Sequence, residues 1–152
     1  MISVSEFCHF ADKALDEMIA IVRGLGDGLA NTRPDFDGAN SPYVILSHCL
    51  GVMAYWGGQV VAGRDVQRDR AAEFEASGRV SELIERAEAA REQLHADAGT
   101  VQPGQPPRGA VGPRYDRPAT TPTQGAMLLH VYEELAQHLG QLEITRDVLL
   151  SR

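Results

Sequence analysis

The chain has 152 residues, 43% of them hydrophobic and 23% charged, which fits one ordinary globular domain spanning residues 1–152. Its formal net charge of -7 disfavours nucleic acid and anionic membrane surfaces as partners. No apolar run approaches the roughly 20 residues of a spanning helix, and the start MISVSEFCHF does not resemble a signal peptide. We therefore expect a cytoplasmic protein.

The first predicted element is an amphipathic helix from Val4 to Val22. Apolar residues recur in it at intervals of three and four, and charged residues occupy the other positions. Glycines follow closely, and we expect them to end this helix: Gly24, Gly26 and Gly28.

A second helix is predicted to begin at Ser41 as N-cap, with Pro42 at the first helical position, and to end near Gly63. A third helix is predicted over about Val80 to Ala96, where an apolar stripe faces a solvated charged face. In the polar stretch between them we expect surface ion pairs among Arg64, Asp65, Arg68, Asp69, Arg70 and Glu73.

A proline-rich segment from Gly99 to Thr120 separates the third helix from the last one. Structureless connections of this length are uncommon unless they are functional or mobile, so we interpret it as a lid. Thr121, Pro122 and Gln124 match a capping box that opens the final helix. Four helices without a strand pattern predict an all-α fold, a four-helix bundle with a long loop before its last helix.

The two cysteines, Cys8 and Cys49, both lie in helical patterns and form no CxxC pair, so we expect reduced core thiols. Cys49 follows His48 directly, and adjacent helical side chains diverge by about 100 degrees. The two side chains are therefore not expected to point at one ion.

Three polar side chains stand on helix faces that should be buried. His48 lies among apolar residues of the second helix, while Glu134 and His138 lie between apolar residues of the last. A buried charge is costly without a partner or a metal, and residues four apart on a helix are neighbours. Imidazole and carboxylate donors suit zinc or a similar divalent ion, and three ligands leave a position open for water or substrate.

His130 competes with His138 because it also lies four residues from Glu134. Eight residues separate the two histidines, about 12 Å along a helix, so both cannot reach one ion. We prefer His138 because it lies mid-helix, and we assign His130 either a supporting role beside the ligands or an exposed position. A hydrogen-bonded core network without any ion stays open as an alternative.

Two stretches, GANSPYVILSHCLGVMAYWGG with RDVQRDRAAEF behind it, and LLHVYEELAQHLGQLEITRD, resemble the DinB/YfiT-like superfamily of metalloenzymes. The resemblance implies an up-down-down-up four-helix bundle whose ion is bound by His48, Glu134 and His138, with Gln141 completing the H-x-G-Q motif. Many members have histidine in place of Glu134. A chain with glutamate at this position resembles the branch that includes mycothiol transferases and mycothiol-dependent maleylpyruvate isomerase.

The resemblance further implies a metal-dependent transferase, with an isomerase as the alternative within the same branch. The ion, zinc before nickel, iron or manganese, would bind the sulfur of mycothiol and favour the thiolate, which then attacks an electrophilic small molecule. Gln141 and His130 would orient the ligands, and a carboxylate of thiol or substrate would meet Arg108, Arg114 or Arg117. A non-catalytic metal-binding or stress-related protein is the competing hypothesis. A homodimer would use Phe74, Leu149 and Leu150.

Overall fold

The computed structural model describes residues 2–111 and 122–151, and all regular structure within these ranges is helical, as predicted. The second predicted helix consists of two parts, an α-helix that continues without a break as a π-helix. The elements are α1 (Val4–Ala30), α2 (Pro42–Val52), the π-helix η1 (Met53–Ala62), α3 (Arg70–Phe74), α4 (Val80–Ala98) and α5 (Gln124–Leu150).

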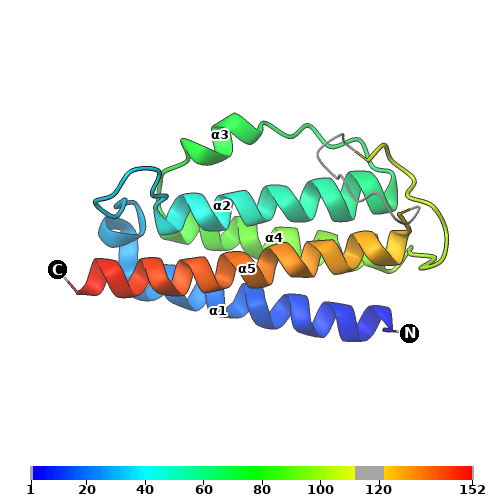
Figure 1. Ribbon diagram of the computed structural model, residues 1–152, viewed down its shortest axis with the longest axis horizontal. Helices are drawn as coiled ribbons and strands as arrows, with labels where there is room; N and C mark the ends of the chain where they lie inside the picture. The colour runs from blue at the N-terminus through cyan, green and yellow to red at the C-terminus, as the bar shows by residue number, and fades with distance from the viewer. Residues whose placement is uncertain (1, 112–121, 152) are drawn as a thin grey trace.

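The long helices lie side by side with their axes nearly aligned (Figure 1). α1 and α5 run in one direction, whereas α2 with η1 and α4 run in the other. The short α3 lies outside α2, on the connection that returns the chain to the start of α4. The core is formed where the apolar stripes meet, and its fully buried side chains include Leu15, Met18, Val22, Leu46, Val60, Leu83, Met127, Leu135 and Leu142.

α2 is the most enclosed helix, because it contacts α1, α3, α4 and α5. Every residue from Pro42 to Leu50 is buried, so this part of α2 has no solvated face. Together with η1 it forms a helix of 21 residues, Pro42–Ala62, whose mean hydropathy of 1.3 would allow it to span a membrane. The expectation that no such run exists was therefore wrong. The window is 72% buried inside the protein, as in the core helix of a globular domain.

α1 does not end at its glycines. Gly26 alone leaves the helical conformation, with φ 65 and ψ 176, and the chain then resumes its helix as far as Ala30. A left-handed φ is strained for residues with a Cβ, which explains glycine here. Leu25 and Ala30 are both buried on either side of the kink, so tertiary packing overrides the low helix propensity of the glycines.

α5 begins two residues later than predicted. Its N-cap is Thr123, whose hydroxyl accepts from the Ala126 amide, and Thr121 lies outside the described residues. Gln124 is buried, accepts from the Gln102 amide and donates to the Pro106 carbonyl, so it anchors the preceding segment instead of closing a capping box. Only residues 99–111 of the predicted lid are described; residues 112–120 lie outside the description.

Two of the positions expected in a dimer interface have other neighbours. Leu149 is buried in its own chain, and the Phe74 ring lies 5.2 Å from the His48 ring, centroid to centroid. Leu150 is 59% exposed. The sequence pattern marked all three positions as apolar but could not separate those that face the chain's own core.

An ion pair joins the end of η1 to the end of α4. Arg64 donates from Nε and Nη2 to the two carboxylate oxygens of Asp97 at 2.7 and 2.8 Å, and Gln93 donates to Asp97 as well. Asp97 is only 3% exposed. Arg64 therefore pairs with a residue 33 positions away and not with the neighbouring Asp65.

Replacing Asp97 by alanine should lower the free energy of unfolding by about 2 kcal/mol, because charge-assisted hydrogen bonds to a buried carboxylate are lost. Arg64 is partly exposed and regains water, which limits the loss. Urea denaturation followed by circular dichroism measures the change. Asp65→Ala is the matched control and should change stability by less than about 0.5 kcal/mol; equal effects of the two substitutions would contradict the assignment.

Candidate metal centre

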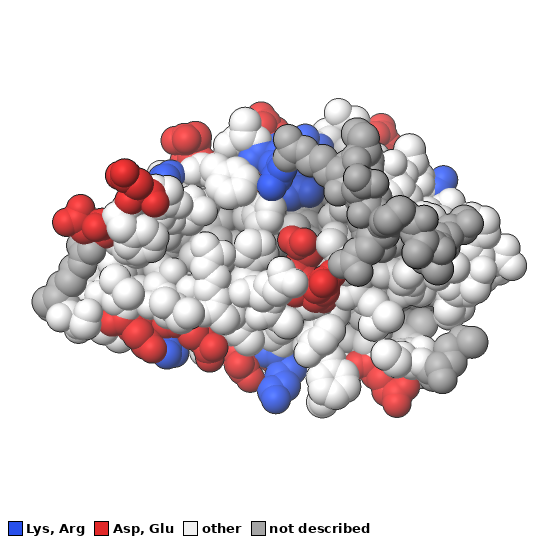
Figure 2. Space-filling view, viewed as in Figure 1, with Lys and Arg blue, Asp and Glu red and all other residues white. Residues whose placement is uncertain are grey.

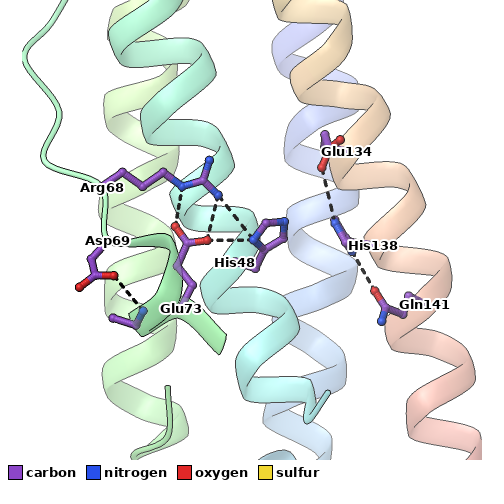
Figure 3. Close-up of polar contacts among 8 residues, drawn as sticks. His48, Arg68, Asp69, Glu73, Glu134, His138 and Gln141 are labelled. Atoms are coloured by element: carbon purple, nitrogen blue, oxygen red, sulfur yellow. Dashed lines mark hydrogen bonds and ion pairs between the residues drawn. The ribbon is translucent and has the colours of Figure 1, made fainter. Parts of the chain in front are cut away.

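His48 owes its position to the way α2 begins. Ser41 caps the helix by accepting from the Val44 amide, and Pro42 occupies the first helical position, as the sequence predicted. Two turns later the helix presents His48 toward α5, with only 7% of the residue exposed (Figure 3). An imidazole enclosed to this degree needs a partner for each ring nitrogen.

Glu134 and His138 lie one turn apart on α5, on the side of that helix that faces α2. α2 with η1 runs antiparallel to α5, so successive turns of the two helices face one another. The His48 and His138 rings lie 4.9 Å apart, and eight residues further along each helix the Trp56 and His130 rings lie 4.7 Å apart. One helix register therefore defines a row of facing side chains.

The three predicted ligands come together in this seam. One donor atom each from His48, Glu134 and His138 lies within 4.8 Å of the other two. Ligands bound tetrahedrally at about 2.1 Å lie about 3.4 Å apart, and His138 Nε2 is already 3.6 Å from a Glu134 oxygen. Small side-chain rotations would thus complete a metal site. Figure 2 shows acidic side chains at the centre of the face of the molecule turned to the viewer, with basic side chains directly above them.

The second nitrogen of His138 is fixed by Gln141, 2.8 Å from Nδ1 to Oε1. When Nδ1 carries the hydrogen and donates to the amide oxygen, Nε2 is left with its lone pair facing Glu134. Gln141 is the last residue of the H-x-G-Q motif, and its role beside a metal ligand stays a prediction.

His48 likewise has a hydrogen-bond partner for Nδ1, although the sequence predicted that partner only in a surface ion pair. Its Nδ1 lies 2.9 Å from Oε2 of Glu73 on α3, and Arg68 donates to both oxygens of Glu73 at 2.6 and 2.8 Å. Side-chain exposures are 8% for His48 and 11% for Glu73. Sequence reasoning missed this arrangement because Glu73 is 25 residues from His48. The sequence feature that could have indicated a side chain packed against this part of the helix is Gly51, a glycine inside a helix one turn after His48.

The electrostatic environment separates the two histidines. The Glu134 carboxylate beside Nε2 raises the pKa of His138, and the same contact lowers the pKa of Glu134. Burial lowers the pKa of His48, against the opposing effect of its hydrogen bond to Glu73. Burial thus favours the neutral form of His48, whereas the contact between His138 and Glu134 favours the charged form of each.

The model of the family described as mycothiol-S-transferase matches residues 6–150, almost the whole chain. The chain belongs to the mycothiol-S-transferase family. A comparison with curated proteins gives no match. Membership in this family bears out the resemblance to the mycothiol transferase branch of the DinB/YfiT-like superfamily.

In this family member His130 lies beside the three convergent residues but does not join them. Its Nδ1 is 3.0 Å from Glu133, and its Nε2 is 3.7 Å from the Glu134 oxygen opposite the one that faces His138. The Glu134 carboxylate thus lies between two histidines, and only His138 also reaches His48. The Trp56 and His130 rings meet edge to face, with an interplanar angle of 89°, and form an aromatic wall next to the site.

Three arginines were predicted to bind a carboxylate of the thiol or substrate, and one of them, Arg108, lies in the part of the chain that the structure describes. Arg108 donates twice to Thr100 at the end of α4, and its amide donates to the Val60 carbonyl, twelve residues along the helix from His48. Its guanidinium is therefore engaged away from the candidate centre. Arg114 and Arg117 lie outside the described residues.

Both cysteines are free thiols, as predicted. Cys49 is fully enclosed, and burial raises the pKa of its thiol far above the usual range. A buried neutral thiol is a poor nucleophile and a poor metal ligand. Neither role therefore falls to Cys49, although it is the neighbour of His48 in the sequence.

In the metal-free protein we expect His138 to protonate at a higher pH than His48, with midpoints above and below about 6.5 respectively. Histidine ring NMR across pH 5–9 measures both midpoints. Glu134→Gln should move the His138 midpoint downward because the carboxylate charge is lost. Glu143→Gln, an exposed substitution on the same helix, is the control and should leave it unchanged; a His48 midpoint above that of His138 would contradict the geometry.

Proposed function

We propose that the protein transfers a low-molecular-weight thiol, mycothiol, to an electrophilic small molecule at a divalent metal centre of His48, Glu134 and His138. The observation that carries the proposal is the convergence of these three donors within 4.8 Å in a chain of the mycothiol-S-transferase family. Family membership supports thiol transfer, and the donor set supports the metal.

The donor set fits one ion of borderline hardness. Two neutral imidazoles and one carboxylate leave a divalent ion with a net charge of about +1, which favours an anionic ligand in a remaining position. When bound, the ion would supply a Lewis acid that favours the thiolate form of the thiol at neutral pH. We prefer zinc; nickel, iron and manganese accept the same donors.

The chain's own residues would position this chemistry. Gln141 and Glu73 keep each Nδ1 occupied, so that both Nε2 atoms face the same point. The aromatic wall of Trp56 and His130 would bound the adjoining space on one side. Arg114 and Arg117 stay candidates for binding a carboxylate of thiol or substrate.

We further propose the up-down-down-up four-helix bundle for the fold, which the helix directions support. A homodimer in the cytoplasm is part of the same proposal. The exposed Leu150 is the apolar position, of those named from the sequence, that is available to a partner. An isomerase of the same branch would use the same ligands, so the two reactions differ in the electrophile supplied.

Purified wild-type protein should contain about one zinc ion per chain and conjugate mycothiol to a model electrophile. His48→Ala and Glu134→Ala should lose the ion and reduce turnover by at least about 100-fold, since even changes beside metal ligands cost 10–100-fold. Elemental analysis and thiol-conjugation rates measure the two effects. His9→Ala, an exposed histidine on α1, is the matched control and should behave as wild type.

The competing hypothesis, a metal-binding protein without turnover, predicts a different result when a chelator removes the ion. The apolar core of this chain is continuous across the long helices and does not need an ion to close it. We therefore expect the chelated protein to keep its helical circular dichroism and cooperative melting while thiol conjugation stops. Loss of helix on chelation would instead favour a structural ion, as in domains that fold only with metal.

A further inference from the structure

We propose that Glu73, held by Arg68, is a positioning residue that determines which nitrogen His48 offers to a divalent ion, and that α3 is thereby coupled to the metal centre. The inference rests on the metal centre of the proposed function. It concerns residues outside the three ligands and a helix, α3, that contributes none of them.

The hydrogen-bond chemistry allows one arrangement only. A carboxylate oxygen can only accept, so the 2.9 Å contact to Glu73 requires the hydrogen of His48 to be on Nδ1. Nε2 then has a free lone pair, and in Figure 3 the His48 ring extends from Glu73 toward Glu134 and His138. Metal-binding histidines commonly donate their other N–H to a carboxylate in this way.

Arg68 fixes Glu73 and also supplies the alternative. Its guanidinium donates to both Glu73 oxygens, and Nη2 lies 3.5 Å from His48 Nδ1. Without the carboxylate, Arg68 would be the nearest donor to Nδ1. The hydrogen of a neutral imidazole would then move to Nε2, where it blocks metal binding.

α3 is held against α2 by a small number of side-chain contacts. It is five residues long and none of its residues is buried. The Phe74 ring lies against the His48 ring, and Arg33 donates to the Phe74 carbonyl at the end of α3, while Asp69 caps its start by accepting from the Ala72 amide. The docking of α3 and the orientation of His48 therefore share the Glu73–His48 contact. A divalent ion that binds His48 must then also stabilise the docked position of α3.

Gly51 provides a second, independent argument. It lies one turn after His48 on α2, and a Cβ at this position would overlap the Glu73 carboxylate oxygen and approach Arg68 Nε to 3.1 Å. Alanine is otherwise the better helix former by about 1 kcal/mol. Glycine at this position is explained by the space that the Glu73–Arg68 pair occupies against the helix.

Three single variants of the full chain test the proposal: Glu73→Ala, Gly51→Ala and, as control, Glu75→Ala, which removes an exposed glutamate of the same segment. Zinc affinity is measured by competition with a chromophoric chelator. We expect the first two to weaken zinc binding by about 10–100-fold and the control to match wild type. Gly51→Ala removes no polar group, so its loss cannot be ascribed to a missing charge.

Two further measurements separate positioning from general damage. Nitrogen-15 NMR of the metal-free protein should show His48 with its hydrogen on Nδ1 in wild type and on Nε2 in Glu73→Ala. Hydrogen exchange should show that zinc protects the amides of residues 70–78 in wild type and not in Glu73→Ala. Unchanged tautomer and unchanged exchange would overturn the proposal, whatever the melting temperatures.

The outcomes also distinguish this proposal from the one on which it rests. If wild type binds zinc and Glu73→Ala binds it equally well, the positioning role is wrong and the metal centre stands. If only Gly51→Ala loses affinity, the effect belongs to the α2 backbone and the role of Glu73 is again wrong. If wild type binds no zinc, the metal centre itself fails and the positioning role falls with it.

Discussion

The candidate site depends above all on the antiparallel packing of α2 with η1 against α5 in one register. His48 and Trp56 are eight residues apart on one helix, and their ring partners His138 and His130 are eight apart on the other. A shift of one turn would place His48 opposite a different residue and leave a buried imidazole without its neighbours. The apolar residues that interdigitate between these helices therefore also determine which polar groups meet.

Burial gives these polar groups their chemistry. In water, imidazoles and a carboxylate at such distances would interact weakly, because solvent screens their charges. Between α2 and α5 most of that solvent is excluded, so the Glu134 carboxylate raises the pKa of His138 while burial lowers that of His48. The charged forms of Glu134 and His138 are thus favoured beside an imidazole whose neutral form is favoured.

Irregular elements surround this regular seam. The π-helix η1 follows directly after α2, and π-helical turns often occur near functional sites. α3 covers the outer side of α2 and contributes Glu73 to the site without contributing to the core. The core thus comes from the long helices, while Glu73 on the short, exposed α3 contacts His48.

Much of this arrangement is determined by the sequence alone. The spacing of apolar residues predicts each long helix, because a helix must bury one face, and a polar residue on that face predicts a partner. His48, Glu134 and His138 were found on these grounds, and Gln141 through its place in a motif. Both residues of the Glu134–His138 pair lie on one helix, so their proximity follows from helical geometry.

The tertiary structure decided the contacts between residues that lie far apart in the chain. Arg64 pairs with Asp97 instead of Asp65, and Glu73 reaches His48 across 25 residues. The start of α5 at Thr123 likewise follows from contacts that Gln124 makes with the preceding segment. Local patterns report which faces are buried, but they contain no information about which face of another helix will cover them.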